Sequence, residues 1–128
     1  AAREDNALCE RFIGPETDSL SVPWQAQTVW LNPPYGRGVG RWVEKAYREA
    51  KAGKTVGVLI FARTDTRWWH DFVMKSLVVY LIRGRLKFVA GDGSASNPAT
   101  APSCFVVFGR YPPPGGPRFI SLDFDHVL

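Results

Sequence analysis

The sequence has no long hydrophobic run and only two cysteines. Its longest apolar segments are strand-sized, so no helix is expected to span a bilayer. Residues 1–5 lack the apolar stretch of a signal peptide. Cys9 and Cys104 show no metal-ligand spacing, so we expect two buried, reduced thiols in a cytosolic protein and no metal site. The 12 glycines and 10 prolines follow no period, which excludes collagen and predicts long loops.

Acidic residues are scarce where basic residues gather. The 128-residue chain has 16 Lys and Arg against 12 Asp and Glu, a net charge of +4. Residues 1–31 hold two basic and five acidic residues, residues 33–87 hold twelve and four, and residues 88–128 hold two and three. The middle segment therefore carries the whole positive excess. A basic surface of this kind attracts phosphate backbones, although any single Lys or Arg could equally lie on the solvated face of a helix.

Hydrophobic patterning predicts one α/β domain over residues 1–128. The first part of the chain, residues 1–27, reads as a short helix or turn followed by a loop. The elements expected next are a strand over 28–31, a helix over 41–52, a buried strand over 55–61, a helix capped by Thr64 or Asp65, and a strand over 77–82. This alternation is typical of a parallel sheet with right-handed crossovers. Beyond it we expect an exposed loop over 89–102, a strand over 103–108, a stiff turn over 112–117 and an edge strand over 119–124.

One short motif carries chemistry. Asn32-Pro33-Pro34-Tyr35 lies between the first expected strand and the first expected helix, where open α/β sheets bind ligands. The Asn32 side chain and the Pro33 carbonyl can each accept a hydrogen bond from an amino group, and the Tyr35 ring offers a face to a flat base. Two such acceptors favour a localised lone pair on an aromatic amine and stabilise the positive charge that develops when it attacks. The alternative is that the prolines only end the strand.

Residues near this motif have alternative interpretations. The glycines of 36–40 do not fit the G-x-G-x-x-G spacing, so we interpret them as a flexible loop beside a substrate pocket. Arg63 and Trp68 follow the second strand and could border that pocket or bind DNA phosphate. Trp69 and Asp65 are better explained as core and cap, and His70 lacks partners for a metal site.

Longer strings of residues point to a family. They are 29–36 (VWLNPPYG), 42–46 (WVEKA), 62–71 (ARTDTRWWHD) and 84–88 (GRLKF), with Asn6 to Cys9, Asp18 to Leu20 and Trp24 upstream. Over roughly residues 1–109 the chain resembles the phage-type DNA N6-adenine methyltransferases, the phage Dam family. The resemblance implies a Rossmann-like fold that uses S-adenosylmethionine, with a mostly parallel sheet and an antiparallel strand near the C-terminus.

The resemblance also implies roles for particular residues. Asn32, Pro33, Pro34 and Tyr35 would form the catalytic motif, and Asp18 and Asn32 would bind S-adenosylmethionine, although Asp18 could instead cap a turn. Double-stranded DNA would be the partner, bound through Arg63, Trp68, Arg85, Lys87 and Phe88. The last three of these could instead form a solvated strand end. The expected location is the cytoplasm of a bacterial host, with the protein encoded by a phage or prophage, and no membrane is involved.

The chain departs from the family at its start. An acidic residue that ends a preceding strand usually comes directly before the Ala-rich pair that here is Ala1-Ala2. We therefore expect weak binding of S-adenosylmethionine and an unpaired sheet edge through which the chain could form a homo-oligomer. Two other functions stay open, a protein glutamine methyltransferase and a non-catalytic DNA-binding remnant.

Overall fold

A computed structural model describes residues 20–89, 95–98 and 101–123. Five strands form one sheet in the order β1-β2-β6-β3-β7, and β4 and β5 form a separate two-stranded sheet. The elements, in chain order, are β1 (Thr28–Leu31), α1 (Val39–Lys51), β2 (Thr55–Phe61), α2 (Arg67–Asp71), the 3-10 helix η1 (Val73–Lys75), β3 (Val78–Ile82), β4 (Lys87–Val89), β5 (Ala95–Pro98), β6 (Ser103–Phe108) and β7 (Arg118–Leu122). No helix within these residues is both long and apolar enough to cross a membrane.

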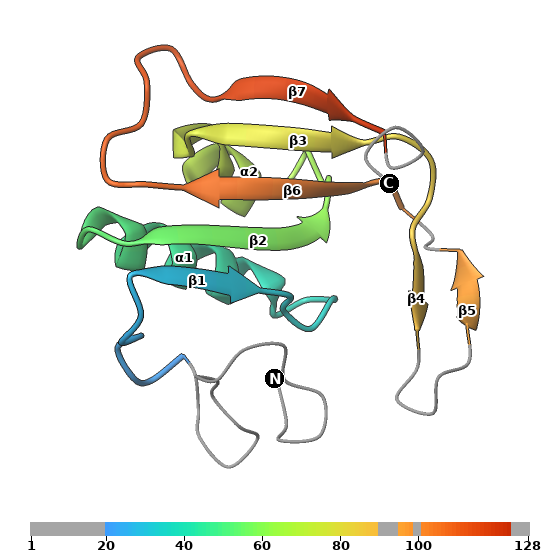
Figure 1. Cartoon of the computed structure of the whole chain (residues 1–128), viewed down its shortest axis with the longest axis horizontal. Coiled ribbons are helices and arrows are strands. Elements are labelled where there is room, and N and C mark those ends of the chain that lie inside the picture. Colours follow the sequence, from blue (N-terminus) through green and yellow to red (C-terminus); the bar gives the residue numbers. More distant parts are fainter. Residues whose placement is uncertain (1–19, 90–94, 99–100, 124–128) are drawn as a thin grey trace.

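The five-stranded sheet is mixed. β1 pairs with β2, and β3 with β7, in parallel. β6 is antiparallel to both β2 and β3, between which it lies. Four strands thus point one way and β6 points the other way (Figure 1). The α/β alternation predicted from the sequence is present, and so is the late antiparallel strand that the resemblance implied. The sheet is nevertheless mixed rather than mostly parallel as expected, because both pairings of β6 are antiparallel. The sequence did not predict that this strand separates β2 from β3.

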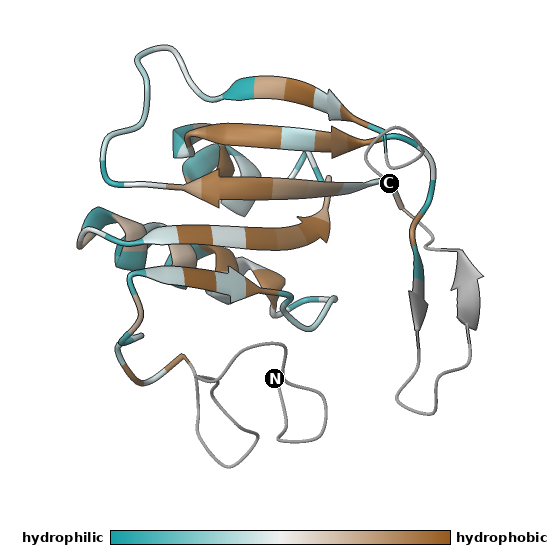
Figure 2. Cartoon of the chain, viewed as in Figure 1, coloured by the Kyte–Doolittle hydropathy of each residue, from teal (hydrophilic) through white to brown (hydrophobic). Residues whose placement is uncertain are grey.

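One face of the sheet packs against the helices. Figure 1 shows α1 and α2 behind the sheet, and Figure 2 shows hydrophobic residues running along β2, β3 and β6. Alternate residues of the central strands point into this layer, where they meet the apolar side of α1. The core comprises Val56, Val58 and Ile60 of β2, Cys104, Val106 and Phe108 of β6, and Val43, Ala46 and Ala50 of α1, together with Trp24, Val39, Trp69, Val73 and Val79.

The opposite face carries an aromatic pair that depends on a glycine. The rings of Trp30 and Phe105 stack with centroids 5.0 Å apart, and in the sheet Trp30 pairs with Gly57 of β2 whereas Phe105 pairs with Leu59. A Cβ atom at Gly57 would lie 2.4 Å from the Phe105 ring. Glycine at this position therefore lets the Phe105 ring lie flat across the strand.

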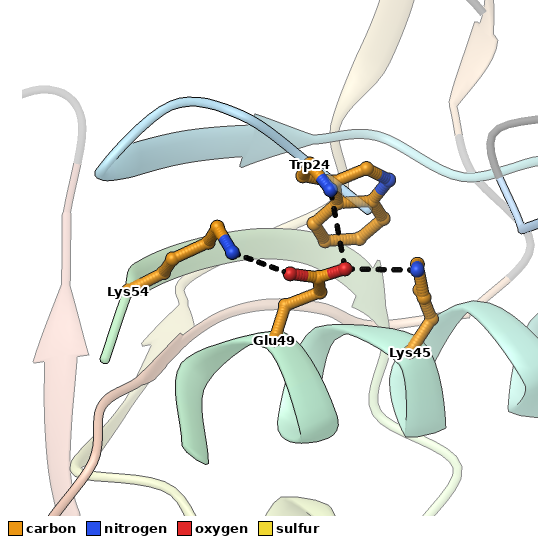
Figure 3. A network of polar contacts seen from close by, with 4 residues as sticks. All are labelled: Trp24, Lys45, Glu49 and Lys54. Carbon is orange, nitrogen blue, oxygen red and sulfur yellow. Dashed lines mark hydrogen bonds and ion pairs between the residues drawn. The ribbon is translucent and has the colours of Figure 1, made fainter. Parts of the chain in front are cut away.

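A buried carboxylate ties the segment before β1 to α1 (Figure 3). Glu49 is 7% exposed, and its Oε1 accepts a 3.2 Å hydrogen bond from the backbone N–H of Trp24. The Nζ atoms of Lys45 and Lys54 lie 2.8 and 2.7 Å from its two oxygens. Burial alone would raise the pKa of Glu49, but these hydrogen bonds outweigh it and lower the pKa to about 2. The contacts fix the path of the chain into β1, from which the motif at 32–35 follows.

Several local expectations need correction. The first helix begins at Val39 rather than at Arg41, because Val39 is buried with the core, so Gly40 belongs to the helix and not to a loop. The cap of the second helix is Thr66, whose Oγ1 accepts from the N–H of Trp69 at 3.3 Å, and not Thr64 or Asp65. That helix is short and continues as η1.

The region over 89–102 is also not simply a loop. Its described parts include β4 and β5, which pair as an antiparallel ribbon extending away from the end of β3 (Figure 1). Ala101 is buried, so the region also differs from the expectation in not being exposed throughout. The turn over 112–117 and the edge strand that follows it are confirmed, with Gly115 and Gly116 at positive φ and β7 at the edge.

Candidate functional site

The exits of β1 and β2 place two sequence segments side by side. The strands are parallel, and Leu31 at the end of β1 pairs with Val58, so β2 runs three residues further, to Phe61. The chain leaving β1 turns through Pro33 and Pro34, which cannot donate to a strand ladder. It then comes back alongside the last residues of β2, where the Tyr35 hydroxyl lies 3.5 Å from the Leu59 carbonyl oxygen.

The motif residues divide into exposed and buried groups. Asn32 and Pro34 are exposed, Pro33 is buried, and Tyr35 is half-buried. The Tyr35 hydroxyl donates a 3.0 Å hydrogen bond to Asn32 Oδ1. Burial, with a smaller contribution from Cys104, raises the pKa of Tyr35, so the hydroxyl keeps its proton at neutral pH. A side-chain oxygen acceptor and an aromatic ring therefore lie together at the end of β1.

An aromatic stack joins this motif to β2. The Tyr35 and Phe61 rings are nearly parallel, with an interplanar angle of 13° and centroids 4.4 Å apart. The Arg63 guanidinium lies over the Phe61 ring, 5.6 Å from its centroid. Stacked rings and a cation over a ring both stabilise such an arrangement. The positions of Tyr35, Phe61 and Arg63 are thus linked.

These side chains border a surface pocket of about 590 Å³. Its lining residues are Tyr35, Gly36, Arg37, Val39, Phe61, Arg63, Thr66 and Trp68. Trp68 lies close to α1, since a Cβ atom at Gly40 would be 3.0 Å from its Cδ1. The described lining is aromatic and apolar with two arginines, and it contains no Asp or Glu. Such a pocket suits a flat, neutral ring attached to an anionic group.

The structure brings together some of the residues expected from sequence. Tyr35, Arg63 and Trp68 share the pocket, and Asn32 adjoins it through Tyr35. Arg85 and Lys87 do not line the pocket. They are exposed where the chain passes from β3 into β4, at the edge of the sheet where β1 and β2 also end.

Other expected residues have different positions. Phe88 belongs to β4, but its side chain lies outside the described residues, as do Asp18 and Cys9 entirely. Asp65 is exposed. A ring nitrogen of His70 lies 2.9 Å from the Thr64 carbonyl oxygen. Trp69 is part of the core, as expected. Within the described residues, no group of three or more His, Cys, Asp or Glu could hold a metal ion.

Cys104 is a buried, free thiol of β6. Burial raises its pKa to about 12. It pairs in register with Ile60 and so lies beside the end of β2, on the neighbouring strand. A thiol with so high a pKa is a poor nucleophile, which agrees with the expectation of a reduced, structural cysteine.

The sequence analysis missed Phe61 and Thr66 as members of the site, and it placed Arg37 beside the pocket only as part of the loop over 36–40. Phe61 was assigned only to a buried strand. The available signal was its position as the last residue of that strand, directly before the segment that contains Arg63. Phe61 ends a strand expected to run parallel to the strand before Pro33 and Pro34, so it could have been considered as a partner for Tyr35.

Comparisons with known proteins agree on one family. A family model described as DNA N-6-adenine-methyltransferase (Dam) matches residues 1–120. A DNA N-6-adenine-methyltransferase of Haemophilus phage HP1 (strain HP1c1) is 28% identical over 125 residues, which cover 94% of this chain and 72% of that protein. One of Escherichia phage T1 is 30% identical over 108 residues, 72% of this chain and 45% of that protein. No solved structure matches the chain significantly.

Proposed function

Because this chain belongs to the DNA N-6-adenine-methyltransferase (Dam) family, we propose that it transfers a methyl group from S-adenosylmethionine to N6 of adenine in DNA. The observation that carries this proposal is the motif at the exit of β1, where Asn32 and Tyr35 are joined by a hydrogen bond beside an aromatic pocket. The same family supports a Rossmann-like arrangement of the α/β fold.

The chemistry follows from the two acceptors at the turn. Asn32 Oδ1 and the Pro33 carbonyl would each accept one hydrogen of the adenine amino group. With S-adenosylmethionine bound, these two acceptors would localise the N6 lone pair for attack on the methyl carbon. The N–C bond would form as the carbon–sulfur bond of the donor breaks, and N6 would then lose a proton to water. Preorganised acceptors stabilise the positive charge that develops on N6, so this step needs no separate base.

The described residues fit the methyl acceptor better than the methyl donor. The pocket walls are aromatic or apolar at Tyr35, Val39, Phe61 and Trp68, which suits a flat base. S-adenosylmethionine supplies an electrophilic methyl group on a sulfonium, and its ribose and amino group favour carboxylate partners. Two residues are proposed to contact the donor. Asn32 is within the described residues, and Asp18 is outside them.

A base inside a duplex cannot reach this pocket without leaving the stack. We therefore propose that double-stranded DNA is bound with the target adenine flipped out. Arg63 at the pocket would bind a phosphate near the flipped nucleotide, and Trp68 would form part of the wall. Arg85 and Lys87, on the same edge of the sheet, would contact phosphates further along the duplex, together with the aromatic residue Phe88.

A glutamine side chain is the other acceptor that this motif could hold. The family match and the excess of twelve basic over four acidic residues in segment 33–87 favour DNA. The direct test supplies labelled S-adenosylmethionine with either duplex DNA or a glutamine-bearing protein. We expect label in the DNA alone. Label in the protein alone would contradict the proposal.

A non-catalytic remnant would fail differently. Calorimetry separates it from an enzyme, because an enzyme must bind S-adenosylmethionine whereas a remnant binds only DNA. We expect binding that is weak but measurable. DNA binding without any binding of S-adenosylmethionine, at concentrations up to the millimolar range, would favour the remnant.

We also propose that the chain self-associates through β1. Within the described residues, β1 is paired on one side only, and Trp30 on it is 60% exposed. An edge strand with an exposed aromatic residue is a template for pairing with a second chain. Trp30→Lys should shift sedimentation from dimer towards monomer, whereas Tyr111→Lys, at another exposed aromatic residue, should not. A wild-type chain that sediments as a monomer at all concentrations would contradict this.

A further inference from the structure

Phe61 lines the pocket and also contacts the motif at 32–35, and the role of this contact has not yet been assigned. It is the last residue of β2, and its ring lies 4.4 Å from the Tyr35 ring at an interplanar angle of 13°. β2 is held on both sides, by β1 and by β6, and Phe61 itself pairs with Ser103. Tyr35, by contrast, lies in the turn that follows β1, outside any helix or strand. The Phe61 ring, on a strand paired within the sheet, can therefore hold the Tyr35 ring, which lies in the turn.

We propose that Phe61 is a positioning residue for the methyl-transfer site and that it acts through Tyr35 on Asn32. This role rests on the proposed function of the same site. Phe61 would not touch the reacting atoms. By stacking on Tyr35 it would keep the Tyr35 hydroxyl within hydrogen-bond distance of Asn32 Oδ1, where it lies 3.0 Å away.

The hydrogen bond to Asn32 matters because a side-chain amide has two ends of nearly equal shape. Only its oxygen can accept a hydrogen from the adenine amine, since its nitrogen is a donor. A hydroxyl that donates to Oδ1 fixes which end of the Asn32 amide is the oxygen. The second lone pair of that oxygen then stays available for the substrate amine. The amide would otherwise be free to turn its amino end towards the substrate amine, where two donors would meet.

Two further contacts bear on this geometry. The Leu59 carbonyl, also on β2, lies 3.5 Å from the Tyr35 hydroxyl, but the hydroxyl has one hydrogen to donate and the shorter bond, to Asn32 at 3.0 Å, is the stronger. The Arg63 guanidinium lies over the Phe61 ring at 5.6 Å. Burial keeps the Tyr35 hydroxyl protonated and able to donate. The last residue of β2 thus provides the stacking ring, and Arg63, two residues further on, provides a cation that covers it.

The kinetic test compares three single variants. Phe61→Leu keeps an apolar side chain but removes the flat ring, whereas Phe61→Tyr keeps the ring. Phe119→Leu is the control, since it is the same substitution on β7. We expect kcat for DNA methylation to fall about tenfold or more in Phe61→Leu, with KM for DNA within about twofold, because misplacing a catalytic group slows the chemical step. Phe61→Tyr should retain most of kcat, and Phe119→Leu should match the wild type. An unchanged kcat in Phe61→Leu would overturn the proposal.

A double variant tests whether Phe61 acts through Tyr35. If it does, adding Phe61→Leu to Tyr35→Leu should lower kcat by less than about twofold further, because the stack is already lost. Two independent losses whose effects multiply would show that Phe61 acts by another route and would overturn the proposal.

A second readout needs no activity. With 3-fluorotyrosine in place of tyrosine, the fluorine resonance of residue 35 is assigned by its loss in Tyr35→Phe. In Phe61→Leu we expect this resonance to move and to titrate at lower pH than in the wild type, since the ring loses its cover. A folded Phe61→Leu variant with an unchanged resonance and titration would overturn the positioning role. Absence of methylation by the wild type would contradict the proposed function instead, and the fluorine signal would still decide the role of Phe61.

Discussion

At the scale of single residues, the proposed chemistry requires Asn32 to be an acceptor rather than a structural residue. Its side chain is exposed, and the hydrogen bond from the Tyr35 hydroxyl is the contact that orients it. The sequence indicated this role because the motif at 32–35, between a strand and a helix, places hydrogen-bond acceptors and an aromatic ring at a ligand-binding edge of the sheet. The stack of Tyr35 on Phe61 was missed, since it joins residues 26 positions apart through the pairing of two strands, and the position of Phe61 at a strand end was the one sequence signal for it.

Replacing Asn32 tests the acceptor role. Asn32→Ala should lower the methylation rate by on the order of 10²–10³, the usual effect of losing one preorganised hydrogen-bonding group. Asn32→Asp, which keeps a side-chain oxygen, should be at least about tenfold faster than Asn32→Ala. The free energies of unfolding of both variants should lie within about 0.5 kcal/mol of the wild-type value, because Asn32 is exposed. Rates are measured on duplex DNA and stability by thermal unfolding. Equal loss in the two folded variants would show that the oxygen is not the functional group.

At the scale of secondary-structure elements, local pattern predicted most strands and long-range pairing decided their arrangement. The bounds of β1, β2 and β6 agree with those expected, because each is a short β-branched or aromatic run between turn residues. The insertion of β6 between β2 and β3 was not predictable, since hydrophobic pattern shows that a strand is buried but not which strands flank it. The β4–β5 ribbon was missed because segment 89–102, which contains β5, is rich in Gly, Ala and Ser and resembles a loop.

The cap of α2 gives a test at this scale. Thr66 Oγ1 accepts from the N–H of Trp69, and Trp69 is a core residue. Thr66→Ala should therefore lower the free energy of unfolding by about 1 kcal/mol, the typical value for a lost N-cap. Asp65→Ala is the matched control, as it alters the neighbouring exposed residue and should have little effect. A larger loss in Asp65→Ala, measured by urea unfolding, would show that the cap is misassigned.

The contact between α1 and the segment before β1 makes stability depend on pH. The pKa of Glu49 is about 2 in the folded chain, below its ordinary value of 4.5. Its stabilisation is therefore present above pH 4.5 and is lost as the pH falls towards 2, and it amounts to about 3 kcal/mol. Glu49→Gln should be less stable at neutral pH and should lose less stability on acidification than the wild type.

Glu44→Gln is the control for this prediction. Glu44 lies on the same helix and pairs with Arg48 at 3.5 Å, but that pair is exposed. Its removal should change stability by at most about 1 kcal/mol and should leave the acid dependence as in the wild type. Unfolding curves between pH 2 and pH 7 compare the three proteins. Parallel pH profiles for wild type and Glu49→Gln would show that this carboxylate is not held as described.

At the scale of the whole molecule, the proposed approach of DNA depends on both the charges and the direction of the strands. Arg63, Arg85 and Lys87 lie beyond the carboxyl ends of β2 and β3, at the edge that holds the pocket. Lys51 and Lys75 lie before the start of β2 and β3, at the opposite edge. The sequence showed that segment 33–87 is basic, but only the direction of the strands shows which of its charges share an edge with the site.

This separation predicts an unequal salt dependence. Duplex binding should weaken steeply with salt because phosphate contacts release counterions. Replacing Arg85 and Lys87 by Ala should weaken binding to all sequences and flatten the slope by about one unit per lost contact. The matched control, Lys51 and Lys75 to Ala, removes the same charge from the opposite edge and should leave the slope within about half a unit of the wild type. Equal effects of the two double variants would mean that net charge, and not this edge, binds DNA.

The most direct test of the whole account identifies the product. The protein is incubated with S-adenosylmethionine and duplex DNA of mixed sequence, the DNA is digested to nucleosides, and these are separated by mass spectrometry. We expect N6-methyldeoxyadenosine as the new nucleoside, formed by the wild type and reduced by on the order of 10²–10³ in folded Asn32→Ala. Methylation of another base, or undiminished N6-methyldeoxyadenosine in Asn32→Ala, would contradict it.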